Sequence, residues 1–390
     1  MWKIVRGSYE SFDTQCPHAG RDAHAAVWLG RTGAQARSSR AGIGARELRR
    51  ETGIARLTRV KLLVLNCHEA WIHQLGVLRA ELDIVVGLPG RYTKGWDDRM
   101  RPLPAGARTI TLEQARSSDC PYECVVNHNI TDLLDTRVLD APKLLVLHDT
   151  LEGRMAQQDA EFDAREMRAM LNSYLAAVGG HAIAISRSKA KSWGVTHSVV
   201  HNSADPDAYL PYSGEIAAGV RVANHVASKR VFLAWDFHEA ALTGLPLRIV
   251  GHNPDMAGVE AAADWGALKG ILASHRFLVH TADARYEDGY NMAVLEAMAA
   301  GMPVLTNRHP TSIVEHGVTG FVAETPTEMR GYAERLLGDV ELARTLGANG
   351  RAYIARHFSV DRFRVEFSKA LQEARKKWTR RRGRLAVPGR

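Results

Sequence analysis

The sequence has few cysteines and no long apolar run, and both absences exclude whole classes of protein. Its 390 residues contain only four cysteines, and the spacing CPYEC at 120–124 is not that of a typical zinc site. We expect these cysteines to be free thiols in a reducing cytosol. No stretch of about 18 apolar residues could span a membrane, and no apolar segment near the start resembles a secretory signal.

The positive charge of the chain is unevenly distributed. The net charge is +8 at pH 7, and much of it lies in an Arg-rich opening segment and in the run RKKWTRRRGR at 375–384. A basic tail suits contact with anionic lipid or nucleic acid, and it equally suits a solvated end of the chain. The expected location is therefore cytoplasmic, with a peripheral place at the inner membrane as the alternative.

Strand and helix patterns alternate from residue 60 onwards and predict an α/β protein. The first convincing strand is KLLVLNC at 61–67, an apolar run of the kind that is buried in a parallel sheet. Similar runs recur until a polar, Pro-containing stretch at 202–215, after which the series begins again. We expect two doubly wound, Rossmann-like sheets with a cleft between their carboxyl edges, where ligands of such folds bind.

This pattern divides the chain into five segments. Residues 1–59 show no sustained period and are expected to be a disordered or dispensable extension. Rossmann-like domains are expected at 60–205 and 206–358. A terminal helix at 359–378 is expected to pack back, followed by a basic tail at 379–390.

The stretch YEDGYNMAVLEAMAAGMPVLTN at 286–307 contains an apolar helix with a single acid. Residues 292–300 all favour helix, and Gly301 and Pro303 end it. Glu296 lies inside this helix and needs a polar partner, because burying an unpaired carboxylate is costly. The partner is either another residue of the protein or a ligand.

A nucleotide fits this stretch. The start of a helix attracts phosphate through its unpaired N–H groups and its dipole, and Gly289 lets the backbone approach a ligand closely. Glu296 lies about 9 Å along the axis at 1.5 Å per residue, which suits a carboxylate that holds ribose hydroxyls. Asp288 would then face the group on the far phosphate. The alternative is that Glu296 pairs with an arginine and Asp288 caps the helix.

Four sequence motifs resemble those of one enzyme family, and they occur along the chain in the same order as in that family. DGYNMAVLEAMAAGMPV resembles the E-x7-E signature of the GT-B glycosyltransferases of retaining family 4 (glycosyl transferases group 1). Further resemblances lie in SIVEHGVTGFV at 312–322, HNSADPDAYLP at 201–211 and NHNITDLLDTRVLDAPKLLVLHDT at 127–150. The resemblance covers roughly 60–370 and implies a GT-B fold, in which two Rossmann-like domains face a central cleft. It also implies that the domain at 60–205 lies on the acceptor side and that the domain at 206–358 binds the donor.

The resemblance implies roles for the residues of the signature. Glu296 would bind the ribose of a nucleotide-sugar donor, and Asp288 would hold the transferred sugar. The helix start at Gly289, Tyr290 and Asn291 would counter the charge of the departing phosphate, although the family usually has Pro-Phe-Gly there. The first acid is also unusual, because Asp288 stands in place of the family's glutamate.

Two further positions complete the implied site. His148 follows a strand and would contact the transferred sugar. Lys229 would bind the diphosphate, but the arginine that usually accompanies it is Asn224 in this chain. An amide does not replace a bidentate guanidinium. Arg221 or Arg230 would have to reach the phosphates instead, or the diphosphate is held less tightly.

Other polar residues follow strands on the acceptor side. His68, Glu69 and His128 are candidates to line the acceptor site. The segment HEAW at 68–71 is not a metal motif, because no second histidine follows at helical spacing. We therefore expect no metal site and no separate cofactor.

The implied function is a hexosyltransferase-type transfer from a nucleotide-sugar, with retention and without metal. The acceptor is left open between a glycan, a lipid, a metabolite and DNA. The lost arginine and the shortened acid keep a second class open, a catalytically decayed GT-B protein that acts as a binding or scaffolding module. The basic tail keeps a DNA-directed glycosyltransferase open as well.

Overall fold

The computed structural model describes residues 60–89, 95–117, 122–158 and 162–386. The expected extension at 1–59 and the last four residues, 387–390, lie outside this part of the chain. Within the described residues, no helix has both the length and the apolar character needed to cross a bilayer.

The N-terminal domain is built on a six-stranded parallel sheet of order β3-β2-β1-β4-β5-β6. Its strands are β1 (Lys61–Leu65), β2 (Glu81–Val85), β3 (Ala107–Ile110), β4 (Cys124–Asn127), β5 (Lys143–Leu147) and β6 (His181–Ala184). Every residue of β4, β5 and β6 is buried. Strands covered on both faces need apolar side chains on both, which explains the continuous apolar runs of the sequence.

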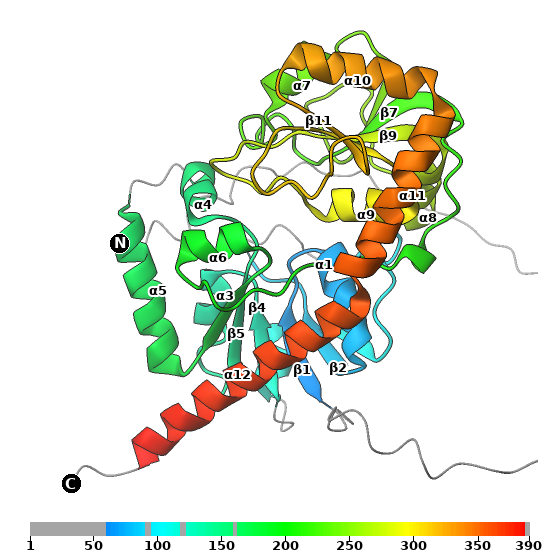
Figure 1. The fold of residues 1–390 in the computed structure, drawn as a ribbon. Coiled ribbons are helices and arrows are strands. Elements are labelled where there is room, and N and C mark those ends of the chain that lie inside the picture. Colours follow the sequence, from blue (N-terminus) through cyan, green and yellow to red (C-terminus); the bar gives the residue numbers. More distant parts are fainter. Residues whose placement is uncertain (1–59, 90–94, 118–121, 159–161, 387–390) are drawn as a thin grey trace, which may run out of the picture.

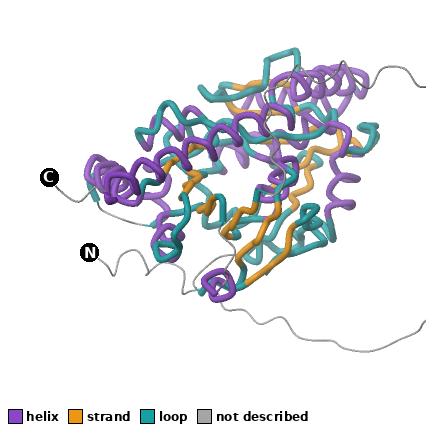
Figure 2. The backbone as a smooth tube through the Cα atoms, turned by 90° about the horizontal axis from the view of Figure 1, so that it is seen from below, coloured by secondary structure: helices purple, strands orange, loops and turns teal. Residues whose placement is uncertain are grey.

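Most helices of this domain begin a few residues after a strand, and together they cover both faces of the sheet (Figure 2). They are α1 (Glu69–His73), η1 (Gln74–Leu78), α2 (Leu112–Ser117), α3 (Ile130–Asp135), α4 (Leu151–Gln157), α5 (Ala164–Val178) and α6 (Arg187–Trp193). The side chains of His68, Asn129, Thr150 and Ser186 each accept a hydrogen bond from a first-turn amide. These caps fix where the helices begin at the carboxyl edge of the sheet.

The C-terminal domain repeats this plan with five parallel strands in the order β11-β10-β9-β7-β8. The strands are β7 (Ile216–Val222), β8 (Leu247–Val250), β9 (His275–His280), β10 (Val304–Asn307) and β11 (Gly320–Ala323). The helices are η2 (Pro206–Ala208), α7 (Trp235–Leu242), α8 (Trp265–Ser274), α9 (Met292–Ala300), α10 (Pro326–Gly338) and α11 (Val340–His357). The expected fold class, two doubly wound α/β domains, is confirmed.

The last helix, α12 (Val360–Ala386), returns from the C-terminal domain and lies along the N-terminal one (Figure 1). Phe363 and Phe367 are fully buried in the core that also contains Leu62 and Trp71. The helix runs on through the basic segment that was expected to be a tail, as far as Ala386. The N-terminal core is therefore closed by residues from the other end of the chain.

The packing of α12 gives a test of this arrangement. Phe367→Ala should lower the free energy of unfolding by about 3 to 5 kcal/mol, because it removes a buried ring and leaves a cavity. Val365→Ala is the control on the same helix, since Val365 is 46% exposed, and it should change stability by no more than about 0.5 kcal/mol. Urea unfolding followed by circular dichroism measures both, and equal effects would contradict the docking of α12.

Candidate active site

The two acids at helix α9 both meet cations from the N-terminal domain. Glu296 forms an ion pair with Arg101, which lies between β2 and β3. Asp288 Oδ2 lies 3.0 Å from Lys189 Nζ of α6, and the same ammonium lies 2.9 Å from Glu287 Oε1. Arg101, Lys189, Asp288 and Glu296 are all buried. Helix α9 therefore directs both carboxylates into the interface between the domains.

The loop that carries Arg101 is itself attached to the C-terminal domain. The Trp265 amide donates to the Arg99 carbonyl over 2.8 Å, and the Arg101 guanidinium lies 4.4 Å from the centre of the Trp265 ring. Burial and the nearby charge of Glu296 raise the pKa of Tyr209 well above its usual value. The partner of Glu296 is therefore Arg101. This agrees with the alternative interpretation of the sequence, in which Glu296 pairs with an arginine of the protein.

Asp288 lies among buried polar atoms that lack partners within the described residues. These atoms are Asp288 Oδ1, His280 Nε2 and His309 Nε2. Burial lowers the pKa of His280 to about 3 and also lowers the pKa of His309, on which the charge of Asp288 acts in the opposite direction. Native proteins rarely bury polar atoms unpaired, so this group suits the hydroxyls of a ligand.

Lys189 supplies the positive charge at this position. Burial acts to lower the pKa of its ammonium, but the charges of Glu287 and Asp288 outweigh burial and raise it. Lys189 therefore remains protonated and compensates the buried carboxylate of Asp288. Asp288 does not cap helix α9.

The start of α9 makes several contacts within the protein. The Gly289 amide donates to Thr311 Oγ1 over 2.6 Å. A Cβ at Gly289 would lie 2.7 Å from His309 Nδ1 and 2.7 Å from the Ser312 amide nitrogen, so glycine is required by the neighbouring loop. The close approach expected of Gly289 is thus made to the protein, and its contact with a phosphate stays a prediction.

The next two residues of the helix start are also engaged. Tyr290 is buried against Phe358, with ring centres 5.8 Å apart, and burial raises its pKa to about 12. Asn291 is the N-cap, and its side chain accepts a hydrogen bond from the Val294 amide over 3.1 Å.

Lys229 is exposed. Its charge contributes to the pKa of His68, which is lowered to about 4 first by burial and then by Arg101 and Lys229. The Lys229 ammonium is thus within electrostatic range of His68, and its role beside the diphosphate stays a prediction.

Asn224 and the two arginines that were expected to compensate for it at the diphosphate all make other contacts within the protein. Asn224 Oδ1 accepts a hydrogen bond from the His252 amide over 2.8 Å. Arg221 is buried and donates to the Thr281 carbonyl over 3.0 Å, and Arg230 pairs with acids of α7. Within the described residues, Arg101 is the guanidinium that pairs with Glu296 of the signature.

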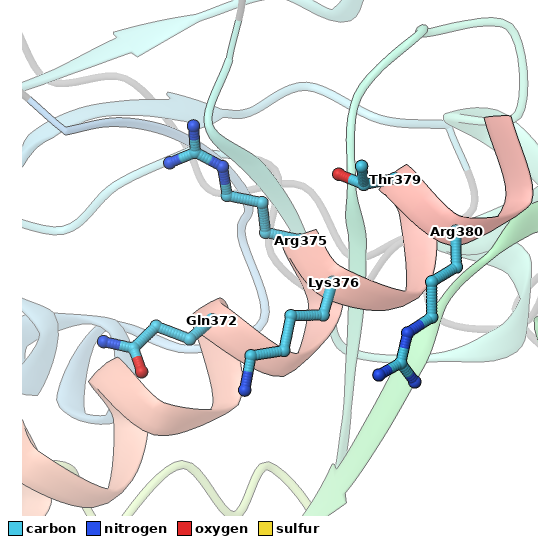
Figure 3. A pocket seen from close by; sticks show the side chains of 5 residues that line it. All are labelled: Gln372, Arg375, Lys376, Thr379 and Arg380. Atoms are coloured by element: carbon cyan, nitrogen blue, oxygen red, sulfur yellow. The ribbon is translucent and has the colours of Figure 1, made fainter. Parts of the chain in front are cut away.

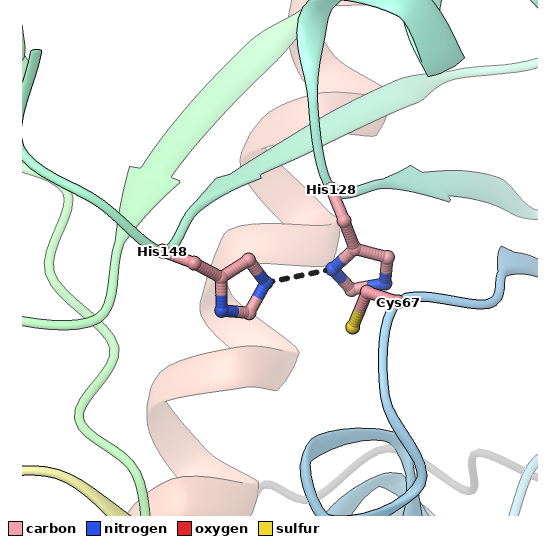
Figure 4. A group of neighbouring side chains, drawn as sticks. All are labelled: Cys67, His128 and His148. Carbon is pink, nitrogen blue, oxygen red and sulfur yellow. Dashed lines mark hydrogen bonds between the residues drawn. The ribbon is translucent and has the colours of Figure 1, made fainter. Parts of the chain in front are cut away.

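His148 follows β5 and lies beside the other strand-end histidines (Figure 4). The distance from His148 Nε2 to His128 Nδ1 is 2.9 Å, and the ring centres of His148 and His68 are 5.9 Å apart. Burial lowers the pKa of His128 to about 3 and that of His148 well below its usual value, so both rings are neutral at pH 7. The sequence thus identified residues that the fold brings together.

Sequence reasoning missed Arg101 and Lys189. Arg101 and Glu296 are separated by 195 positions, and the chain contains 51 basic residues among which no local pattern distinguishes these two. The one available signal was the buried acid itself, which required a partner without identifying it.

The pair of Lys189 and Asp288 is open to a double-mutant cycle. Lys189→Met should lower the free energy of unfolding by about 3 to 5 kcal/mol, because it leaves buried carboxylates uncompensated. Adding Asp288→Asn should recover part of that loss, so the two effects are not additive. Lys191→Met, an exposed site on the same helix, is the control, and strict additivity in denaturant melts would exclude the buried pair.

Comparison with known proteins agrees with this architecture. Residues 237–339, which include all of α9, match the family model described as glycosyl transferases group 1. The match lies within the C-terminal domain and covers the residues that carry the E-x7-E resemblance.

Several solved structures have the same fold. Sucrose-phosphate synthase from Thermosynechococcus elongatus is 14% identical with a TM-score of 0.58, over 81% of this chain and 99% of that one. Anabaena HepE, solved in complex with UDP and glucose, is 13% identical with a TM-score of 0.58, over 80% of this chain and 100% of that one. A glycosyltransferase from Rickettsia africae is 9% identical with a TM-score of 0.54, over 81% and 99% of the two chains. At these identities the likeness shows the GT-B fold.

Proposed function

We propose that this chain is a glycosyltransferase that moves a sugar from a nucleotide-sugar to an acceptor, with retention of configuration. The observation that carries the proposal is the buried carboxylate of Asp288, whose Oδ1 has no partner in the described structure. It lies just before helix α9 at the domain interface, beside unpaired nitrogens of His280 and His309. Such a set of polar atoms suits a sugar with several hydroxyls.

The nucleotide is proposed to bind along helix α9. Glu296 would hold the ribose, and the phosphates would lie towards the helix start, where the dipole favours negative charge. Anabaena HepE was solved with UDP and glucose, which makes a UDP-sugar the first donor to test.

Donor binding is proposed to exchange the partner of Glu296. The Glu296 carboxylate forms an ion pair with Arg101, so ribose hydroxyls would have to replace the guanidinium as its partner. The released Arg101 could then meet the diphosphate, where a bidentate donor is missing because of Asn224. In this scheme the N-terminal domain supplies the guanidinium that the C-terminal domain lacks.

The chemical step is proposed to depend on charge and position. Lys229 and the helix start would stabilise the negative charge that develops on the leaving diphosphate. Asp288 would hold sugar hydroxyls, and the neutral ring of His148 would face the reacting carbon, both as positioning groups. Retention then requires that the acceptor attack the same face of the sugar from which the diphosphate departs.

A second candidate function is that of a binding module on a decayed transferase fold. It is favoured by Asn224 in place of an arginine and by the ion pairs that Glu296 and Asp288 already make within the protein. Prolonged incubation with nucleotide-sugars separates the two functions, because an active site releases free sugar slowly by hydrolysis and a decayed one does not.

The acceptor remains a choice between a glycan, a lipid, a metabolite and DNA. A hollow beside α12 is lined by Gln372, Arg375, Lys376, Thr379 and Arg380 (Figure 3). Arg375 pairs with Glu123, and Lys376 pairs with Glu373. Anionic contact at this basic face is proposed to bring an acceptor or a surface near the enzyme, without a part in the transfer itself.

Donor binding can be measured before any acceptor is known. UDP or UDP-glucose should raise the melting temperature in a thermal-shift assay, because a ligand at 100 times its Kd stabilises the native state by about 2.7 kcal/mol. GDP and ADP sugars serve as controls for the base. The absence of a shift with every nucleotide would favour the binding module with another ligand.

Two substitutions separate the proposed roles. Glu296→Gln should weaken donor binding at least about tenfold with a smaller effect on turnover, because the ribose loses a charged acceptor. Lys229→Ala should slow turnover by about 10²- to 10³-fold, because it removes charge stabilisation of the leaving group. Lys191→Ala is the matched control for a surface lysine. Unchanged donor turnover in both variants would contradict the assignment.

A further inference from the structure

A thiol and two imidazoles converge at the carboxyl edge of the N-terminal sheet. Cys67 follows β1, His128 follows β4 and His148 follows β5, three strands that are neighbours in the sheet. One ligand atom from each side chain lies within 4.8 Å of the other two, and Figure 4 shows the side chains turned towards one another. The parallel topology, rather than a local sequence motif, brings them together.

We propose that Cys67, His128 and His148 form a binding site for Zn²⁺ that leaves one coordination position open. A thiolate with two neutral imidazoles is a donor set that suits zinc, and three protein ligands with an open fourth position are typical of accessible zinc sites. The ligands come from distant parts of the sequence, which is why the expectation of no metal site, based on local spacing, does not cover them.

The unpaired nitrogen of His128 is the independent sign of a missing ligand. Its Nε2 is buried and has no hydrogen-bond partner in the described structure, although the side chain is only 7% exposed. Burying an imidazole nitrogen without a partner is unfavourable. A cation bound at the cluster would give His128 Nε2 a partner that the described residues do not supply.

The distances fit a small rearrangement around a tetrahedral ion. Bonds of 2.0 to 2.3 Å place tetrahedral donor atoms about 3.3 to 3.7 Å apart. Binding through His128 Nε2 would give up the 2.9 Å contact between His128 Nδ1 and His148 Nε2. The ligand atoms, which lie within 4.8 Å of one another, would close by up to about 1 Å.

Metal binding has a defined proton balance. Burial raises the pKa of the Cys67 thiol well above its usual value, so the thiol is protonated without a metal. A bound divalent cation stabilises the thiolate, and binding then releases this proton to solvent. The two imidazoles are already neutral and supply lone pairs without losing a proton to solvent.

Cobalt titration tests the site directly, with no need for turnover. The full chain is used with Cys16→Ser and Cys120→Ser, which leaves Cys67 and Cys124 as its only thiols, and with any purification tag removed. Co²⁺ should give one equivalent of thiolate-to-cobalt charge-transfer absorption, and Zn²⁺ should abolish this signal by displacement. In this background Cys67→Ala should remove the absorption, whereas Cys124→Ala, a buried thiol outside the cluster, should retain it.

A second variant keeps the test informative if Cys67→Ala folds poorly. His128→Gln should weaken Zn²⁺ binding measured by calorimetry at least about tenfold, with folding checked by circular dichroism. Absence of the charge-transfer band in the parent, or its persistence in Cys67→Ala, would overturn the proposal. Because His148 also belongs to the proposed sugar site, these binding data stand apart from activity, so failure of the zinc site leaves the transferase proposal untouched.

Discussion

Buried carboxylates at one helix, each compensated by a cation from the other domain, are the constraint on which the site depends. An uncompensated charge in this interface would be strongly unfavourable, so Lys189 and Arg101 must approach α9 whenever the domains are packed as they are here. The same pairs hold the domains in one relative orientation. A ligand that uses these acids has to donate hydrogen bonds to them, which sugar hydroxyls can do.

The parts of the fold that depend on local pattern were predictable from the sequence. The apolar runs became β1 and β5, and Met292–Ala300 became α9 with the expected stop at Gly301. The helix that closes the chain was expected to end at 378, yet α12 continues to Ala386, because charged residues with long side chains are themselves good helix formers.

The contacts that decide the site were not predictable in the same way. Glu296 required a partner, but the identity of Arg101 depends on how two separately folded domains face each other, and no local period encodes that relation. Gly289 illustrates the opposite case. Its lack of a side chain was correctly linked to close approach, but the structure shows the approaching group to be the loop at Thr311 and Ser312. The grouping of Cys67 with two histidines likewise follows from strand order.

Helix α12 has a consequence for how the protein is made. Its phenylalanines fill the core around Leu62 and Trp71, residues that leave the ribosome some three hundred positions earlier. Domains usually fold as they emerge during synthesis, beginning with the first. In this chain the apolar core of the N-terminal domain stays partly uncovered until α12 has been translated. During synthesis, this domain is therefore the part that most needs a chaperone.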